Sequence, residues 1–190
     1  MGPPLQIVRR RIYSVLLVLS VLASGCRSQE AEEIELILGP EQVVRFQPRA
    51  AFAEYFELSG VSDQLRITLA SYEADCRKLV PPPPHGVSIT ITVESPLGRP
   101  LGVGEYPYTA EEPRLDQPRA LPFIRLHEGA DRLPAYGKLK LTGFEPDLHG
   151  LVRGELEFLN PEEGRGAALS GKFTVRLCRS VLDATRNKED

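Results

Sequence analysis

The 190-residue chain has no tryptophan, a single methionine and only three histidines. His85, His127 and His149 are widely separated, without the short spacings found in preformed metal sites. The sequence also contains no G-x-S-x-G elbow, phosphate-binding loop or dinucleotide-binding fingerprint. We therefore predict no metal, no cofactor and no catalytic residue, and we expect a protein that is not an enzyme.

A basic surplus and a membrane-spanning run are missing as well. The formal net charge is −3 at pH 7, so the chain has no basic stripe for nucleic acid, and no nucleic-acid partner is expected. The apolar run at residues 12–22 is well short of the roughly 20 residues that a spanning helix needs. The N-terminal apolar run therefore needs an explanation other than a membrane-spanning helix.

The N-terminal residues are arranged like an export signal. Three arginines at residues 9–11 precede the apolar run, and the sequence Leu-Ala-Ser-Gly-Cys, ending at Cys26, follows it. This layout resembles that of bacterial lipoprotein precursors, in which small residues precede a cysteine that is lipidated and becomes the mature N-terminus. The alternatives are an ordinary signal peptide cut near Ala23 and a short membrane anchor.

The lipoprotein resemblance implies where the protein is held. Acyl chains on Cys26 would insert into a lipid bilayer, each buried methylene contributing about 0.8 kcal/mol, and two or more chains make the anchor stable. The next residue is Arg27, whereas an aspartate at this position often signals inner-membrane retention in such lipoproteins. The resemblance therefore implies a cell-envelope protein at the outer membrane facing the periplasm, with exposure at the cell surface as an alternative.

The chain divides into four parts by composition. We predict a lipoprotein signal peptide at residues 1–25, a lipidated N-terminus and flexible tether at 26–33, one β domain at 34–180, and a charged tail at 181–190. Removing residues 1–25 takes away three of the 23 basic residues and none of the 26 acidic ones, which leaves a formal net charge of −6. The roughly 165 remaining residues suit a single domain with a sizeable core.

Two cysteines remain once Cys26 carries lipid. An even pair in an exported protein favours a disulfide between Cys76 and Cys178, because the periplasm is oxidising. Closing a loop of about 100 residues would stabilise the fold by roughly 4–5 kcal/mol in the chain-entropy model. The alternatives are two buried free thiols and a catalytic cysteine, which would need a nearby base.

Short segments in which apolar and polar residues alternate predict β-strands throughout the domain. Residues 87–93 alternate most clearly and place Ser88, Thr90 and Thr92 on the outer face. The expected strands are residues 34–38, 42–47, 50–58, 65–72, 87–93, 101–108, 121–127, 136–144, 151–158 and 169–177.

Two stretches leave more than one interpretation open. Residues 50–58 fit a helical face as well as a strand, and we choose a strand because their neighbours are strands. The four prolines at 81–84 predict a stiff polyproline connector, with an aromatic-groove ligand as the alternative. Eight to ten short strands with turns between them are typical of an all-β fold, here an antiparallel β-sandwich or, alternatively, a small β-barrel.

The C-terminal hairpin has a register that the residue types select. Pairing Leu156 with Gly171 and Gly154 with Phe173 lets each large side chain cover a glycine on the buried face. The same register places Glu155 across from a lysine, a cross-strand ion pair worth a few tenths of a kcal/mol. A shift of two residues would instead oppose two arginines, so we predict the first register.

The longest polar insertion, residues 109–119, is a candidate binding loop, because function concentrates in long loops on rigid scaffolds. A solvated loop without a binding role is the alternative. Its candidate binding residues are Glu111, Glu112, Arg114, Asp116 and Arg119.

Residues 65–178 carry a cysteine after an early strand, a glycine-punctuated hairpin and a cysteine closing the last strand. This arrangement resembles single-domain bacterial envelope lipoproteins, a class that brings no known activity. We expect a non-enzymatic interaction or structural module that binds an envelope protein through a sheet edge or the 109–119 loop. The alternatives are a small-molecule or glycan binder, for which Tyr106, Tyr108 and Tyr136 would serve, and a hydrolase with an unrecognised site.

Overall fold

The computed structural model describes residues 33–38, 42–58, 61–76, 81–109, 116–127, 131–160 and 167–181. These residues form strands joined by turns, which confirms the predicted all-β class. No helix within these ranges is long and apolar enough to cross a membrane. The strands are β1 (Ile34–Leu38), β2 (Val43–Phe46), β3 (Ala50–Phe56), β4 (Gln64–Ala70), β5 (Val87–Glu94), β6 (Gly104–Thr109), β7 (Arg119–Leu126), β8 (Asp131–Arg132), β9 (Tyr136–Phe144), β10 (Leu151–Leu159) and β11 (Ala167–Val181).

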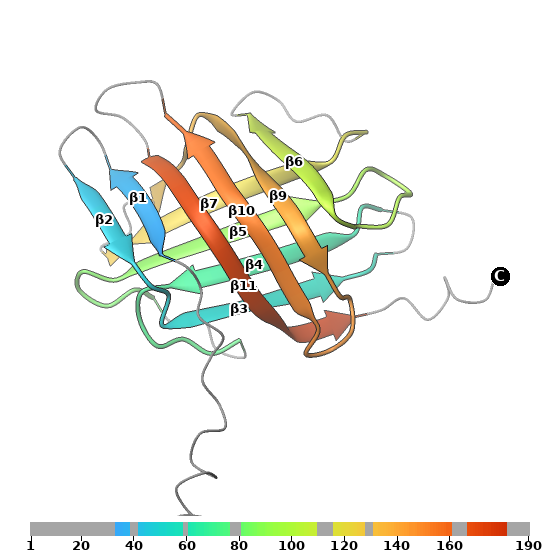
Figure 1. Cartoon of the computed structure of the whole chain (residues 1–190), viewed down its shortest axis with the longest axis horizontal. Coiled ribbons are helices and arrows are strands. Elements are labelled where there is room, and N and C mark those ends of the chain that lie inside the picture. The colour runs from blue at the N-terminus through green and yellow to red at the C-terminus, as the bar shows by residue number, and fades with distance from the viewer. Residues whose placement is uncertain are drawn as a thin grey trace, which may run out of the picture. The chain divides into compact units, whose positions relative to one another are not determined.

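All these strands belong to one continuous sheet that bends back on itself. Its order is β6-β9-β10-β11-β3-β4-β5-β7-β8, with β1 and β2 added beside the first half of β11. Figure 1 shows the result as two layers: β6, β9, β10, β1 and β2 lie over β3, β4, β5 and β7, and the strands of the two layers cross steeply. This is the orthogonal type of sheet packing, in which a strand that bends forms the corner.

Strand β11 forms that corner. Its first half pairs antiparallel with β1, and its second half pairs with β3, from Arg176 opposite Phe52 to Val181 opposite Phe56. The register shifts between Leu177 and Arg179, which is where the strand changes layers. The pairing of β11 with β3 is parallel, whereas the sequence predicts an antiparallel arrangement throughout. A parallel pair needs a long connection, and most of the domain lies between these two strands.

The sheet comes close to closing into a barrel. Strand β6 lies beside β7 across the opening, yet no ladder joins them in the described part of the chain. Each of the two strands contains a proline, Pro107 and Pro122, which removes one backbone donor and disfavours a ladder. The architecture therefore lies between the two predicted alternatives, a sandwich and a small barrel.

The predicted strand boundaries agree closely with the structure, apart from three differences. Strand β8 was not expected, and β11 extends beyond the predicted 169–177 at both ends. Strand β6 begins at Gly104 and not at Leu101, because the N–H of Leu101 donates to Oδ2 of the buried Asp63, 3.2 Å away, and not to a neighbouring strand.

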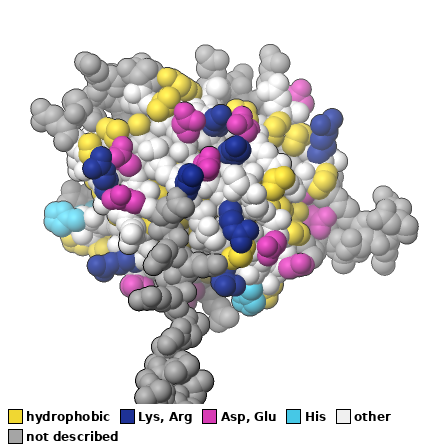
Figure 2. Space-filling view, in the orientation of Figure 1, with side chains coloured by type: hydrophobic (Ala, Val, Ile, Leu, Met, Phe, Trp, Pro, Cys, Tyr) yellow, Lys and Arg dark blue, Asp and Glu magenta, His cyan; other side chains and the backbone are white. Residues whose placement is uncertain are grey.

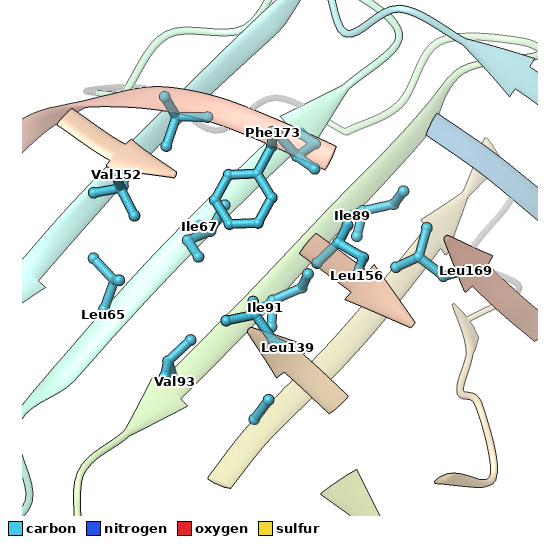
Figure 3. Packing of buried hydrophobic residues seen from close by; sticks show 14 of the residues in the cluster. Leu65, Ile67, Ile89, Ile91, Val93, Leu139, Val152, Leu156, Leu169 and Phe173 are labelled. Atoms are coloured by element: carbon cyan, nitrogen blue, oxygen red, sulfur yellow. The ribbon is translucent and has the colours of Figure 1, made fainter. Parts of the chain in front are cut away.

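The core lies between the two layers and is filled by aliphatic side chains. Figure 3 shows side chains of β4 and β5 meeting those of β9, β10 and β11. Ile67, Ile91 and Leu139, which come from both layers, are fully buried. Burying a side chain of this type contributes roughly 1.5–3 kcal/mol, so this interior supplies most of the stabilisation.

The C-terminal hairpin has the predicted register. Leu156 lies opposite Gly171, Gly154 opposite Phe173 and Glu155 opposite Lys172, with 3.4 Å between Lys172 Nζ and a carboxylate oxygen of Glu155. A methyl group on Gly154 would lie 2.6 Å from Cζ of Phe173, so the ring covers this glycine as expected. Gly171 differs, since the side chain closest to it belongs to β1, which pairs with β11 here.

Candidate functional site

A segment between β4 and β5 covers part of the outer face of the β3–β4–β5–β7 layer. We call its described residues, 71–76 and 81–86, the strap. Tyr72 and Ala74 of the strap pack with Phe52 of β3 and form a small second core on that face. The strap is held at its ends, because Ser71 exchanges two 2.9 Å hydrogen bonds with Val87: its N–H donates to the carbonyl oxygen of Val87, and its Oγ accepts from the N–H of Val87.

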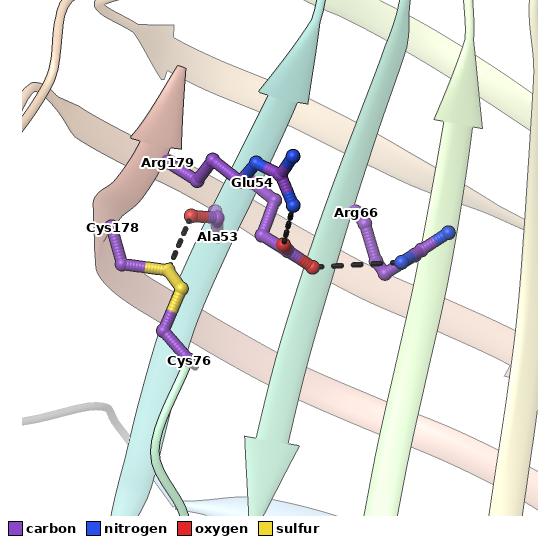
Figure 4. Close-up of a disulfide and its surroundings, with 6 residues drawn as sticks. All are labelled: Ala53, Glu54, Arg66, Cys76, Cys178 and Arg179. Atoms are coloured by element: carbon purple, nitrogen blue, oxygen red, sulfur yellow. Dashed lines mark hydrogen bonds and ion pairs between the residues drawn. A yellow bond between two sulfur atoms is a disulfide. The ribbon is translucent and has the colours of Figure 1, made fainter. Parts of the chain in front are cut away.

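The predicted disulfide fastens the strap to β11. Cys76 and Cys178 are bonded, with their Cα atoms 6.2 Å apart, inside the range that disulfides span. Sγ of Cys178 lies 3.2 Å from the carbonyl oxygen of Ala53, as Figure 4 shows. The bond joins positions 102 residues apart and holds the strap against the sheet.

The proline stretch behaves as the predicted connector and forms a further part of the strap. The carbonyl oxygen of Pro82 lies 3.0 Å from Nδ1 of His127, just beyond β7. A carbonyl only accepts, so Nδ1 of His127 carries the proton in this contact. His127 thus fixes the prolines over the sheet.

The strap and the sheet together enclose a recess of about 320 Å³ on the outer face. Its floor follows β5, where Ser88, Thr90 and Thr92 project outward as the alternation predicts. Small-molecule sites begin at about this volume, so the recess has room for a ligand of one or two rings. Its described lining residues are Arg66, Thr68, Tyr72, Ala74, Pro82, Ser88, Thr90, Thr92, Phe123 and Arg125.

Two guanidinium groups stand at opposite corners of the recess. Arg66 is opposite Thr92 in the register, and Arg125 is opposite Ser88. The guanidinium of Arg125 lies over the ring of Phe123, with 5.2 Å between its central carbon and the ring centroid. The lining therefore combines hydroxyl groups, aromatic faces and two positive charges.

A buried carboxylate positions the first of these arginines. Glu54 of β3 is about 9% exposed and lies 3.5 Å from Arg66 and 4.0 Å from Arg179 of β11, as Figure 4 shows. Both guanidinium groups also lie within 6 Å of the centroid of the Phe56 ring, at 5.9 and 5.4 Å. Glu54 thus lies between two guanidinium groups and offsets part of their positive charge.

The hydroxyl of Thr68 is unusual among the groups around the recess. Its side chain is 2% exposed, and Oγ1 has no hydrogen-bond partner in the described part of the chain. Thr68 lies between Phe52 of β3 and Thr90 of β5 in the sheet register. An unpartnered buried hydroxyl carries a desolvation cost, and native folds keep few of them.

The predicted binding loop is described only at its C-terminal end. Glu111, Glu112 and Arg114 lie outside the described residues, so the prediction for them stays open. Asp116 is exposed in a turn, and Arg119 opens β7 with an ion pair to Glu94. Arg119 belongs to the same outer face as the recess, since Glu94 follows Thr92 on that face of β5. The described contact of Arg119 is therefore this ion pair, which links β7 to β5.

The remaining predicted site residues have separate positions. Cys26 lies outside the described residues, and the disulfide of Cys76 with Cys178 is confirmed. His85 and His149 occupy turns with positive φ angles of 62° and 70°. No group of three or more His, Cys, Asp or Glu in the described part of the chain could hold a metal ion.

The tyrosines considered for ligand binding are mostly structural. Tyr106 is 5% exposed, and its hydroxyl donates to the carbonyl oxygen of Gly102 at 2.6 Å. Burial raises the pKa of Tyr106, and the N–H of Gly102, which donates to the same hydroxyl at 3.2 Å, opposes the shift. Burial also raises the pKa of Tyr108, whose ring packs edge-on against Phe158. Only Tyr136 is exposed, beside a wide, shallow hollow between β6, β9 and β10.

The outer face of the layer that contains β6, β9 and β10 carries acidic and basic side chains that pair with one another. Figure 2 shows this face with positive and negative side chains interspersed. Glu105, Lys140, Glu155 and Lys172 follow one another across β6, β9, β10 and β11 with alternating sign. Lys138 also donates a 3.0 Å hydrogen bond to Glu105, which raises the pKa of Lys138. The strap-covered face is the better candidate site because it contains the recess.

Comparison with protein-family models finds no match to the chain. Comparisons with curated proteins and with solved structures also find none.

Sequence reasoning identified the outward-facing hydroxyls of β5 but did not assign them to a site. Phe123 and Arg125 were missed, although both lie at alternate positions on the outer face of an expected strand. The sequence signal that could have identified them is an aromatic residue followed two positions later by an arginine on the outer face of one strand. Their proximity to the strap depends on tertiary structure.

Proposed function

We propose that the chain is a lipid-anchored protein of the cell envelope whose β domain is a non-enzymatic binding module, with the recess under the strap as its contact site. The observation that carries this proposal is the chemistry of the lining. The described lining residues include no carboxylate, histidine or thiol. Hydroxyl groups bind a ligand but are not activated for attack when no base lines the site with them, so the composition of the described lining favours binding over hydrolysis.

The filled interior supports a site on the surface of the sheet. Large side chains from both layers, such as Ile91 and Leu139, are fully buried and pack together between the layers. A small-molecule carrier would be expected to hold its ligand in a deep apolar cavity between these layers. The recess, by contrast, lies outside the main core and has a polar floor.

The anchor part of the proposal depends on the sequence that ends at Cys26. Strand β1 begins at Ile34, where the predicted tether ends. Intact mass of the membrane-extracted protein tests this part: we expect a chain that starts at Cys26 and carries added acyl mass. An unmodified chain that starts at another residue would overturn it.

Site-specific photo-crosslinking in native cells tests the binding module. A photoreactive side chain is placed at Thr92, at one end of the recess, and in a second variant at Thr142, which is exposed on the other layer. We expect an adduct with an envelope component from position 92 and none from position 142. Equal adducts at both positions, or none at 92, would contradict the assignment of the recess.

A further inference from the structure

Both arginines that line the recess already interact within the chain. Arg66 has an ion pair with the buried Glu54, 3.5 Å away. Arg125 lies opposite Asp131 in the β7–β8 register and has an interaction within the chain as well. The described lining residues include no carboxylate and no lysine. Moving a charged group from water into a site without a free opposite charge is unfavourable, so the recess selects an uncharged ligand.

The backbone of the recess floor is also fully engaged. Strand β5 pairs with β4 on one side and with β7 on the other, along Ser88, Thr90 and Thr92. Extended peptides are recognised at sheet edges, through main-chain groups that are free to pair. A strand with a neighbour on each side has no such edge, so a ligand here must be bound by side chains.

The hydroxyl of Thr68 indicates that the ligand forms hydrogen bonds. Thr68 lines the recess and is 2% exposed, and its Oγ1 has no hydrogen-bond partner in the described part of the chain. Thr90, which also lines the recess, lies opposite Thr68 in the β4–β5 ladder. Residues opposite each other have Cβ atoms about 4.5–5.5 Å apart, a spacing at which one ligand hydroxyl bonds to both threonines. The free protein already bears the desolvation cost of Oγ1, so a bond to it contributes its full value to binding.

The other lining side chains suit a ligand with many hydroxyls and an apolar ring face. The hydroxyls of Ser88, Thr90 and Thr92 repeat about every 6.8 Å along β5, and each both donates and accepts. Phe123 and Tyr72 add aromatic surface, against which the apolar face of a sugar ring packs. Hydroxyl groups beside aromatic faces are the combination that an uncharged sugar matches.

Resting on the binding role proposed above, we infer that the recess binds a neutral saccharide of one or two rings. One sugar hydroxyl bonds to Thr68 and Thr90, further hydroxyls bond along β5, and a ring packs against Phe123. The volume of about 320 Å³ is in keeping with a ligand of this size.

Calorimetric titration of the full chain tests the inference, in a polyoxyethylene detergent that carries no sugar. The neutral probes are galactobiose and glucose, their charged counterparts are digalacturonate and glucuronate, and acetyl-dialanine amide is a neutral peptide probe. We expect at least one neutral sugar to bind about 10-fold or more tightly than its charged counterpart, because the carboxylate loses water without gaining a free cation. Its affinity should stay within about 2-fold between roughly 50 and 500 mM salt, since no charge is paired on binding.

Three variants assign the binding to the recess. Thr68→Val and Thr90→Val should each weaken the neutral saccharide by about 3- to 10-fold, the effect of one lost hydrogen bond. Thr68→Val should do so while raising the urea midpoint of the ligand-free protein, a combination that a damaged fold does not produce. Thr142→Val makes the same change on the exposed face of the other layer and should leave affinity unchanged.

Each outcome separates the ligand class from the binding role. Binding of a charged sugar or of the peptide as tightly as every neutral sugar would overturn the neutral saccharide, and unchanged affinity in both Thr68→Val and Thr90→Val would overturn its contacts. If no probe binds while crosslinking from position 92 succeeds, the ligand class is wrong and the binding module stands. If crosslinking from position 92 also fails, both are wrong.

Discussion

The buried hydroxyl of Thr68 gives the sharpest test of the packing described above. Thr68→Val replaces the hydroxyl by a methyl group of nearly the same size at a position that is 2% exposed. Because Oγ1 has no partner among the described residues, the substitution removes a desolvation cost and breaks no hydrogen bond described there. The variant should therefore be more stable than the natural chain.

The expected magnitude follows from the cost of an unsatisfied buried polar group, which is about 1–3 kcal/mol. The added methyl group buries a little more apolar surface, and valine favours strands at least as well as threonine. We expect a gain of about 1–2 kcal/mol in the free energy of unfolding. For a domain of this size, that gain raises the melting temperature by roughly 2–8 °C.

Urea unfolding followed by circular dichroism measures this difference. The transition midpoint should rise while its slope stays the same, since a changed slope would mean that the surface exposed on unfolding had changed. Thr142→Val, on an exposed strand position, is the matched control and should stay within about 0.5 kcal/mol of the natural chain. A loss of 1 kcal/mol or more in Thr68→Val would refute the reasoning, because it would show that the hydroxyl has a partner.

Three further predictions concern the hairpin, the disulfide and pH. Gly154→Ala should lower the free energy of unfolding by about 1–3 kcal/mol in a denaturant titration, because the new methyl group would lie 2.6 Å from Phe173; an unchanged midpoint would show that the ring moves aside freely. Replacing Cys76 and Cys178 together by alanine should cost about 4–5 kcal/mol in the chain-entropy model, and a loss below 1 kcal/mol in the same titration would contradict that estimate. Burial raises the pKa of Tyr106 above 10.0, so its contribution to stability is complete below pH 10 and is lost as pH rises through the folded pKa. Tyr106→Phe should therefore show a smaller loss of stability between pH 9 and 11, and parallel curves would exclude the linkage.

Strands that are buried on one face were the most predictable part of the fold. In β10 the alternation of Val152, Leu156 and Phe158 with charged residues predicted both the strand and its inward face. The hairpin register was predictable too, because the ring of Phe173 packs over Gly154, the residue opposite it in the ladder. Strand β3 was ambiguous for a physical reason: the strap packs on Phe52 of its outer face, so both faces carry buried apolar side chains and the alternation is weak.

The candidate site was predictable only in its parts. The outward hydroxyls of β5 follow from alternation alone. The Cys76–Cys178 bond was predicted from the two cysteines that remain once Cys26 is assigned to lipid, in a chain expected to be exported. Of the predicted 109–119 loop, Arg119 lies on the outer face that contains the recess, and the structure shows that residue paired with Glu94. Nothing local in the sequence joins Thr90 to the strap.

By itself, the sequence determined the all-β class, the inward and outward faces of most strands, the pairing of the last hairpin and the disulfide. The class, the strand faces and the hairpin pairing depend on periodicity and on cross-strand residue pairs, which are local properties of the chain, whereas the disulfide was predicted from the number of cysteines. Only the tertiary structure decided that β11 bends from one layer to the other, that the strap lies across the outer face, and that Arg66, Thr90 and Phe123 surround one recess. Those features depend on which strands become neighbours, and that is set by packing between segments that are far apart in the chain.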